Sequence, residues 1–269
     1  MDLKNCGSRK DATDPSAISR LLGKDHDRFK IEYHKSIEST NTYAKELARQ
    51  GAENGFTVLA GSQSGGRGRL GRSFFSPEGS GIYMSVVLRP KMNFADSLKI
   101  TAFAAVCVSD AIDALFGTES QIKWVNDIII GNKKVCGILA EAGIDAQAPR
   151  LEYIVLGIGI NVKRTAFPQE LSEIAGSIED FSDKTVSKNQ LIAEILKNLS
   201  PLLDGEIPSD TMDRYRSRSL FLGRSVFTLS EPSVSGVAVE IDDGGALIIR
   251  SSDGALHKIA AGEVSVRSL

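Results

Sequence analysis

The stretch GRGRLG, residues 66–71, decides between two fold classes. It matches the pattern G-x-G-x-x-G, which in a dinucleotide-binding fold lies between a strand and a helix that follows at once. The run FTVLAG, residues 56–61, supplies the strand. The segment RSFFSPEGSG, residues 72–81, contains one proline and two glycines, which would break a helix before the next strand begins. The sequence therefore argues against a dinucleotide-binding turn.

The same loop, named the arginine loop (residues 65–72), has the composition of an anion-binding segment. No acidic residue occurs from Ser62 to Pro77, whereas Arg67, Arg69 and Arg72 alternate with glycines. Glycine allows backbone N–H groups to approach an anion closely, and guanidinium groups bind phosphate or carboxylate oxygens in pairs. The loop therefore suits a polyphosphate and could close over it. A solvated basic surface loop and a small RNA-contacting patch are the alternatives, although no interleaved aromatic residues support the latter.

The composition indicates a globular protein from a reducing compartment. The 269 residues are 42% hydrophobic and 25% charged, and the net charge of −2 argues against a general nucleic-acid or anionic-membrane binder. The three cysteines are widely spaced and odd in number, which is typical of buried thiols. The start of the chain lacks an apolar signal segment, and charged residues interrupt the apolar run 97–116. We therefore expect a cytoplasmic protein without a membrane span.

The predicted elements fall into a large group of strands and helices and a second group of short strands. Strands are expected at 56–61, 81–90, 121–130, 134–142 and 151–162, and helices at 39–51, 96–117, 187–203 and 208–218. Five short apolar runs near the C-terminus, separated by turn residues, predict a small barrel. We therefore divide the chain into a polar tail with one short helix, residues 1–30, a main domain, residues 31–219, and a C-terminal domain, residues 220–269.

Two further features lie inside predicted strands. Lys123 is a lysine in the otherwise apolar run QIKWVND, where it either reaches solvent or faces a pocket. In a pocket its ammonium would neutralise a carboxylate that attacks a phosphate. In GIGINV, residues 157–162, Gly157 and Gly159 permit close approach of a ligand or of backbone, and Asn161 offers an amide. Tight strand packing is the alternative explanation for the two glycines.

Six short segments, taken in order, resemble the biotin protein ligase family. They are ESTN (38–41), QSGGRGRLGR (63–72), KWVNDI (123–128), GILAE (137–141), LGIGINV (156–162) and AGEVSVR (261–267). The resemblance implies an α+β fold, in which a mixed β-sheet with flanking helices, related to the class II aminoacyl-tRNA synthetases, precedes a small SH3-like β-barrel. It also implies a monofunctional enzyme, because the thirty polar residues at the start cannot supply the DNA-binding domain of the repressor members.

The activity implied by this resemblance has two steps. Biotin and ATP, with Mg²⁺, give biotinyl-5′-AMP and pyrophosphate, and a lysine of a biotin carboxyl carrier protein domain then attacks the adenylate to form an amide. The partner implied is that carrier domain of a biotin-dependent carboxylase. Neither nucleic acid nor a membrane is expected as a partner, and a homodimer is left open.

The resemblance also implies the residues of a site. Its biotin- and adenylate-binding residues are Ser39, Thr40, Asn41, Gln63, Gly66, Arg67, Gly68, Arg69, Lys123, Gly157, Gly159 and Asn161. Arg67 and Lys123 are the catalytic residues, because adenylation needs positive charge where the α-phosphate becomes pentavalent. Phe74 stands where some members have a tryptophan that stacks on adenine, and Val125 where the family has a proline. No metal ligand is predicted from the protein, since nucleotide phosphates and water can hold magnesium.

Three rival functions remain at this level. A lipoate or octanoyl ligase of the same superfamily would differ in its acyl pocket. A nucleic-acid-binding module would use the arginine loop without catalysis and would bind in a salt-sensitive way. A small-molecule sensor would retain the adenylate without transferring it.

Overall fold

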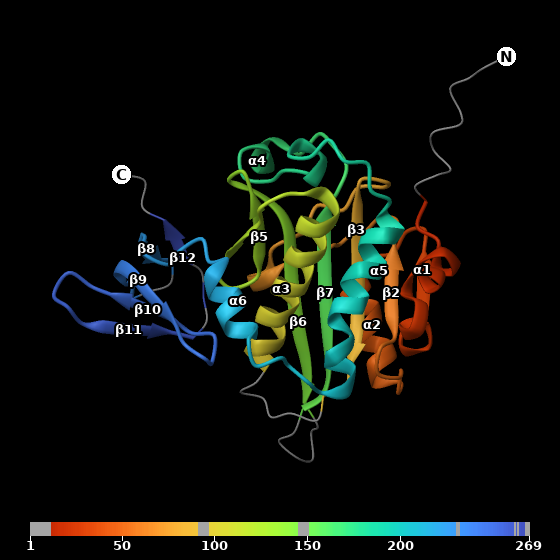
Figure 1. Cartoon of the computed structure of the whole chain (residues 1–269), viewed down its shortest axis with the longest axis horizontal. Helices are drawn as coiled ribbons and strands as arrows, with labels where there is room; N and C mark the ends of the chain where they lie inside the picture. The colour runs from red at the N-terminus through yellow and green to blue at the C-terminus, as the bar shows by residue number, and fades with distance from the viewer. Residues whose placement is uncertain are drawn as a thin grey trace.

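The computed structural model describes residues 12–90, 97–144, 151–229, 232–260, 262 and 264–266. These residues form a seven-stranded mixed sheet covered by helices, and a five-stranded antiparallel sheet beside it (Figure 1). The mixed sheet with flanking helices confirms the predicted fold class.

The large sheet has the strand order β1-β2-β3-β7-β6-β5-β4. Its strands are β1 (Ile31–His34), β2 (Thr57–Ala60), β3 (Gly81–Leu88), β4 (Gln121–Lys123), β5 (Asp127–Ile130), β6 (Lys133–Ile144) and β7 (Leu151–Asn161). Only β1 and β2 pair in parallel, and the other neighbours are antiparallel. The sheet is therefore a mixed one built largely from hairpins.

The run 121–130, predicted as one strand, is two strands joined by a turn. Lys123 pairs with Asp127 across the β4–β5 hairpin, so the chain reverses between them. The turn is held from outside, because the Tyr215 hydroxyl donates to the Val125 carbonyl oxygen at 2.9 Å and the Trp124 indole donates to the Gly245 carbonyl oxygen at 2.9 Å. Trp124 and Val125 in the turn are as apolar as the strands, whereas Asn126 and Asp127 are polar turn-forming residues that the prediction of one strand passed over.

Helices cover the two faces of the sheet unequally. The elements are α1 (Pro15–Leu22), α2 (Thr40–Arg49), α3 (Ser97–Phe116), α4 (Gln169–Ser172), α5 (Lys188–Leu199) and α6 (Thr211–Ser217), with short 3₁₀ turns at Gly23–Arg28, Arg69–Gly71, Ile178–Asp180 and Ser200–Asp204. The main core packs α1, α3, α5 and α6 on one face. On the other face Ala44 and Ala48 of α2 pack against Val58, Val87 and Val155. The partly covered α2 face is the one that bears the site described below.

The N-terminal segment was predicted as a tail with one short helix, residues 1–30. That helix is α1, which Asp14 caps by accepting from the Ser16 amide at 2.9 Å. Ile18 and Leu22 are fully buried, and α1 packs against α5 (Figure 1). The part of the tail from residue 15 onward is therefore packed on the main domain, and residues 1–11 lie outside the described residues.

The C-terminal sheet has the order β11-β10-β9-β8-β12. Its strands are β8 (Ser225–Thr228), β9 (Ser235–Ile241), β10 (Leu247–Arg250), β11 (Leu256–Ile259) and β12 (Val264–Val266). The five predicted strands are present, and all pair antiparallel. Among the described residues β11 and β12 do not pair with each other, so the sheet is not closed into a barrel.

The described helices also bear on the membrane question. None of those within the described ranges is both long and apolar enough to cross a bilayer.

Candidate active site

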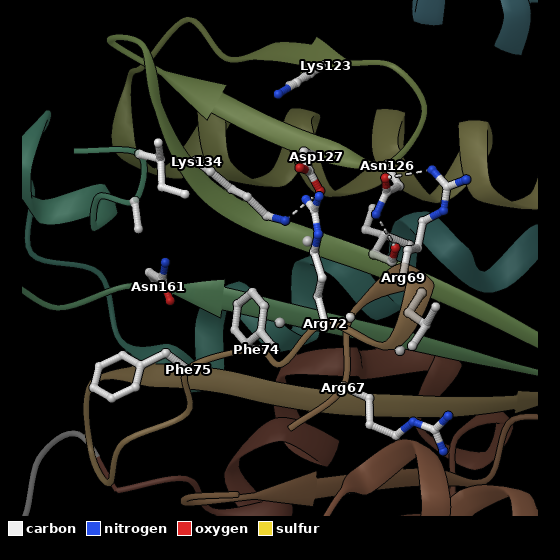
Figure 2. Close-up of a pocket in the computed structure, with 18 of the residues that line it drawn as sticks. Arg67, Arg69, Arg72, Phe74, Phe75, Lys123, Asn126, Asp127, Lys134 and Asn161 are labelled. Atoms are coloured by element: carbon white, nitrogen blue, oxygen red, sulfur yellow. Dashed lines mark hydrogen bonds and ion pairs between the residues drawn. The ribbon is translucent and has the colours of Figure 1, made fainter. Parts of the chain in front are cut away.

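A cavity of about 550 Å³ brings most of the predicted site residues together. It lies over the glycine-rich part of β6 and β7, and α2, the arginine loop and the β4–β5 turn form its walls (Figure 2). Of the residues implied by the resemblance, the following line it: Ser39, Thr40, Asn41, Gln63, Arg67, Gly68, Arg69, Phe74, Lys123, Gly157, Gly159 and Asn161. Gly66 does not. It is buried, and its carbonyl oxygen accepts from the Phe74 amide at 2.9 Å, so it shapes the base of the loop.

One end of the cavity is a buried hydrogen-bonded group at the start of α2. Ser39 is the N-cap of the helix and accepts from the Thr42 amide at 3.4 Å. The Thr40 amide and hydroxyl both donate to Gln63 Oε1, at 2.8 and 3.1 Å. Gln63 Nε2 in turn donates to Ser76 Oγ at 2.8 Å. These bonds fix the orientation of the Gln63 amide before any ligand binds.

Asn41 is held equally firmly, and it explains one of the strand glycines. Its Oδ1 lies 2.6 Å from Ser85 Oγ, a buried hydroxyl on β3 that also lies 2.8 Å from Thr40 Oγ1. A Cβ atom on Gly157 would overlap the Asn41 amide. The group that approaches Gly157 is therefore the Asn41 side chain of the cavity wall, whereas the prediction had named a ligand or backbone.

Phe74 lies against the other strand glycine. A Cβ atom on Gly159 would come within 2.6 Å of the Phe74 ring, and one on Gly137, its partner across β6 and β7, within 3.4 Å. Tyr83 meets the ring edge-on, with a centroid separation of 6.5 Å. The ring therefore lies inside the cavity, over a part of the sheet where Gly137 and Gly159 leave room for it.

The opposite end of the cavity carries cationic side chains. Six basic residues and one acidic residue line the whole cavity: Arg67, Arg69, Arg72, Lys123, Lys134, Arg224 and the acidic Asp127. Lys134 lies 2.7 Å from Asp127 across the β5–β6 pair. The Lys123 ammonium has neither a hydrogen bond nor an ion pair within the described part of the chain. Unbalanced positive charge lining a concave surface attracts a polyanion.

The arginine loop reaches two different walls of the cavity. Arg69 Nη1 donates to Asn126 Oδ1 at 3.2 Å, and Asn126 itself donates to the Ile138 carbonyl oxygen at 2.7 Å. Arg67 extends the other way, with its Nη2 3.6 Å from Glu141 Oε1 (Figure 2). Arg67 and Lys123 share one cavity, but in this arrangement their charged groups do not converge.

Several lining residues were not among the predicted site residues. They are Arg72, Phe75, Asn126, Asp127, Lys134 and Phe167. Asn126 and Asp127 lie within the KWVNDI segment, so the sequence did carry a signal for them. Phe167 had none, because it comes from an irregular segment and meets Phe75 only in the fold, at a centroid distance of 6.1 Å. The C-terminal sheet also contributes, through Arg224, Leu229, Gly262, Val264 and Ser265.

Comparison with known proteins gives family matches over both parts of the chain. The Biotin/lipoate A/B protein ligase family matches residues 33–161, and the Biotin protein ligase C terminal domain matches residues 221–267. The bifunctional ligase/repressor BirA of Bacillus spizizenii is 34% identical over 242 residues, which cover 87% of this chain and 73% of that protein. The biotin–[acetyl-CoA-carboxylase] ligase of Paracoccus denitrificans is 31% identical over 234 residues, or 81% and 92% of the two chains.

A solved structure extends the likeness to three dimensions. The biotin protein ligase from Aquifex aeolicus in complex with biotin and ATP has a TM-score of 0.75 and 28% identity, and the match covers 88% of this chain and 98% of that one. The shared fold, the two family matches and the identity over most of the chain agree with one another. This chain therefore belongs to the biotin protein ligase family.

Proposed function

We propose that the protein activates biotin with ATP to biotinyl-5′-AMP and transfers the biotinyl group to a lysine of a biotin carboxyl carrier protein. The observation that carries the proposal is the division of one cavity into a buried hydrogen-bonded end and a cationic end. Biotin has a neutral polar ring system at one end and a carboxylate at the other. A ligand of that shape would place its carboxylate among the cations, where a nucleotide phosphate would also bind.

We assign the biotin ring to the α2 end of the cavity. The polar residues there are Ser39, Thr40, Asn41 and Gln63, whereas Asn161 lines the cavity further along β7, beyond Gly159. Their amide and hydroxyl groups suit a ureido group, which both donates and accepts hydrogen bonds. Because Thr40, Gln63 and Asn41 are already oriented by neighbours, little conformational entropy would be lost on binding.

We assign adenylation to the opposite end. A biotin carboxylate oxygen would attack the α-phosphorus of ATP, and the bond to pyrophosphate would break. Lys123 would stabilise the charge on the α-phosphate and draw the carboxylate to it. Arg69 lies on the same side through its bond to Asn126. Arg67, the second catalytic residue in the proposal, would have to turn from Glu141 to reach that phosphate.

Magnesium would enter with ATP as part of the substrate. The described residues contain no cluster of three or more His, Cys, Asp or Glu side chains that could hold a metal ion. Asp127 and Asn126 are nevertheless oxygen-bearing side chains in the cavity. One carboxylate together with nucleotide phosphates and water is a common environment for Mg²⁺, so these residues fit an ion that the nucleotide carries.

In the second step the carrier lysine, as a neutral amine, would attack the acyl carbon, and AMP would leave. The adenylate must be kept from water until then, because an acyl phosphate anhydride hydrolyses when exposed. The arginine loop would shield it. Phe74, which lies against Gly137 and Gly159, or the Phe75–Phe167 pair would contact the adenine ring.

The deciding experiment incubates the protein with ATP and either labelled biotin or labelled lipoate, and measures the adenylate retained after gel filtration. Retention of biotinyl-AMP, followed by transfer to a carrier domain, supports the proposal. Retention of the lipoyl compound alone would favour the lipoate ligase rival, while adenylate without transfer would favour a sensor. Salt-sensitive binding of nucleic acid without either adenylate would favour the binding module.

Finer properties also belong to the proposal. We expect a cytoplasmic enzyme of the monofunctional type, with a catalytic domain at 31–219 and a C-terminal domain at 220–269, that does not bind nucleic acid and that could form a homodimer. A gel-shift assay with operator-length DNA and a sedimentation measurement would test the last two expectations.

A further inference from the structure

Two side chains of the arginine loop, those of Arg67 and Arg69, diverge towards different parts of the body of the protein. Arg69 reaches Asn126 at the β4–β5 turn, and Arg67 points the other way (Figure 2). Its partner there is Glu141 on β6. Leu70, which follows Arg69, is 70% exposed, so the tip of the loop packs on little. The position of the loop over the cavity therefore depends on these polar connections more than on apolar packing.

Glu141 does more than pair with Arg67. Its Oε1 lies 2.8 Å from the Lys45 ammonium, and its Oε2 accepts from Asn41 Nδ2 at 3.0 Å. Asn41 and Lys45 are one turn apart on α2, so both face Glu141 from the same side. The carboxylate thus joins three segments: the α2 wall of the cavity, strand β6 and the arginine loop.

The Glu141 carboxyl group stays ionised around neutral pH. Burial alone would raise its pKa, but hydrogen bonds from Lys45 and Asn41, with the charges of Lys45 and Arg67, lower the pKa below its ordinary value. Its side chain is only 20% exposed, whereas that of Arg67 is 48% exposed. The anchor is therefore fixed, and the mobile partner is the arginine.

We infer that Glu141 is a positioning residue of the ligase reaction: through Arg67 it holds the arginine loop over the biotin end of the cavity. This rests on the proposed function. Arg67 would leave Glu141 for the phosphate during adenylation and return to it once pyrophosphate has left, so the loop is held while the adenylate is bound and slows its escape. Asn41 connects the anchor to the residues that would contact biotin. Glu141 lies behind the cavity wall and does not itself line the cavity, so it acts through Arg67 and Asn41.

The experiment measures the rate at which bound biotinyl-AMP leaves the full-length protein after gel filtration into excess unlabelled biotin. Glu141→Gln keeps the shape and an oxygen for Asn41 but removes the charge that Arg67 faces. We expect release about two- to fivefold faster, the effect of a half-exposed ion pair. Arg67→Ala should give a similar increase, and the double variant no further one, because the two residues act as a unit.

Lys45→Met is the matched control, since it removes the other cation from Glu141 and leaves the Arg67 pair in place. We expect no faster release from it. Unchanged release in Glu141→Gln, or an effect of that variant that persists in full in the Arg67→Ala background, would overturn the inference. If Glu141→Gln does not fold, Glu141→Asp replaces it in the double-mutant cycle with Arg67→Ala. The effects of Glu141→Asp and Arg67→Ala on adenylate release must then also be non-additive.

Wild-type protein that forms no biotinyl-AMP would instead overturn the proposed function, and the inference with it. Wild-type protein that forms the adenylate but gives an additive cycle would overturn the inference alone.

Discussion

The two ends of the cavity differ in whether their polar side chains already have hydrogen-bond or ion-pair partners within the protein. At the α2 end, Thr40, Asn41 and Gln63 are tied by hydrogen bonds of 2.6 to 3.1 Å to each other, to Ser85 on β3 or to Ser76 in the loop before it. At the other end, Lys123 points into the cavity without a hydrogen-bond or ion-pair partner within the described ranges, and Lys134 forms an ion pair with Asp127. One end is preorganised, and the other is left with excess positive charge.

The difference matches what each end would have to do. A neutral ring is recognised by shape and by fixed hydrogen bonds, so orienting the partners in advance adds affinity. A reacting phosphate gains negative charge at its oxygens in the transition state, so cations that are not neutralised beforehand stabilise that state more than the ground state. The comparison predicts that changes at the two ends affect different steps.

The largest effect is expected from Lys123→Ala. Removing the unpaired ammonium should slow adenylation by about 100- to 1,000-fold, the usual cost of losing one transition-state contact. Biotin affinity should fall far less, because the α2 end is untouched. Single-turnover formation of biotinyl-AMP and calorimetric titration of biotin measure the two quantities. Equal losses in both would show that Lys123 serves binding alone.

The next effect is expected from Gly157→Ala, at the α2 end. The added methyl group overlaps the Asn41 amide, which cannot move without breaking its bond to Ser85. Biotin should bind about tenfold to a hundredfold more weakly, since overpacking at a fixed site costs about 1–3 kcal/mol. Calorimetry with biotin alone checks this, and an unchanged dissociation constant would place biotin elsewhere.

A smaller effect is expected from Gly159→Ala, two residues along the same face of β7. Its methyl group meets the Phe74 ring, which can tilt because the ring is only partly buried. The KM for ATP should rise by about two- to tenfold, the range for a disturbed aromatic contact, while biotin affinity is kept. Should Gly159→Ala weaken biotin as much as Gly157→Ala does, the two ends are not separate.

The smallest effect concerns Glu141 and pH. Lys45 and Arg67 face this carboxylate, and Arg49 and Glu152 line the same recess. Because its pKa is lowered in the folded protein, the ionised group stabilises the fold above the unfolded-chain pKa of about 4.3, and this stabilisation is lost as the pH falls through the lowered value. Urea midpoints of wild type and Glu141→Gln should differ by a constant amount above about pH 5 and converge below it. A gap that widens in acid contradicts this assignment.

Much of the fold could be predicted because it depends on local pattern. Three kinds of feature act within a few positions of the chain. They are the apolar, strand-forming runs of β3 and β7, the Asp14 and Ser39 helix caps, and the turn residues between the C-terminal strands. The β4–β5 turn was missed because Trp124 and Val125 are as apolar as the strands around them, and the polar Asn126 and Asp127 were not taken as a turn signal. Trp124 and Val125 are held by partners 121 and 90 positions away, respectively.

The candidate site, like the fold, was predicted in part from local sequence. Its amino acids lie in short segments whose order and spacing were enough to indicate the family. The two glycines of β7, Gly157 and Gly159, indicated that another group lies close to this strand. The local sequence did not indicate which side chains of the site would contact one another. Arg67 and Arg69 are two positions apart in the sequence, and the pattern gave no sign that one would join Glu141 and the other Asn126.

The sequence by itself determined the residue chemistry of this protein: a glycine-arginine loop, a lysine in an apolar strand, and polar side chains at a helix start. Only the tertiary structure decided which of these charges are neutralised and which face the cavity unpaired. The reason is physical, because the strength of a charge or a hydrogen bond depends on partners and burial, and both come from segments distant in the chain.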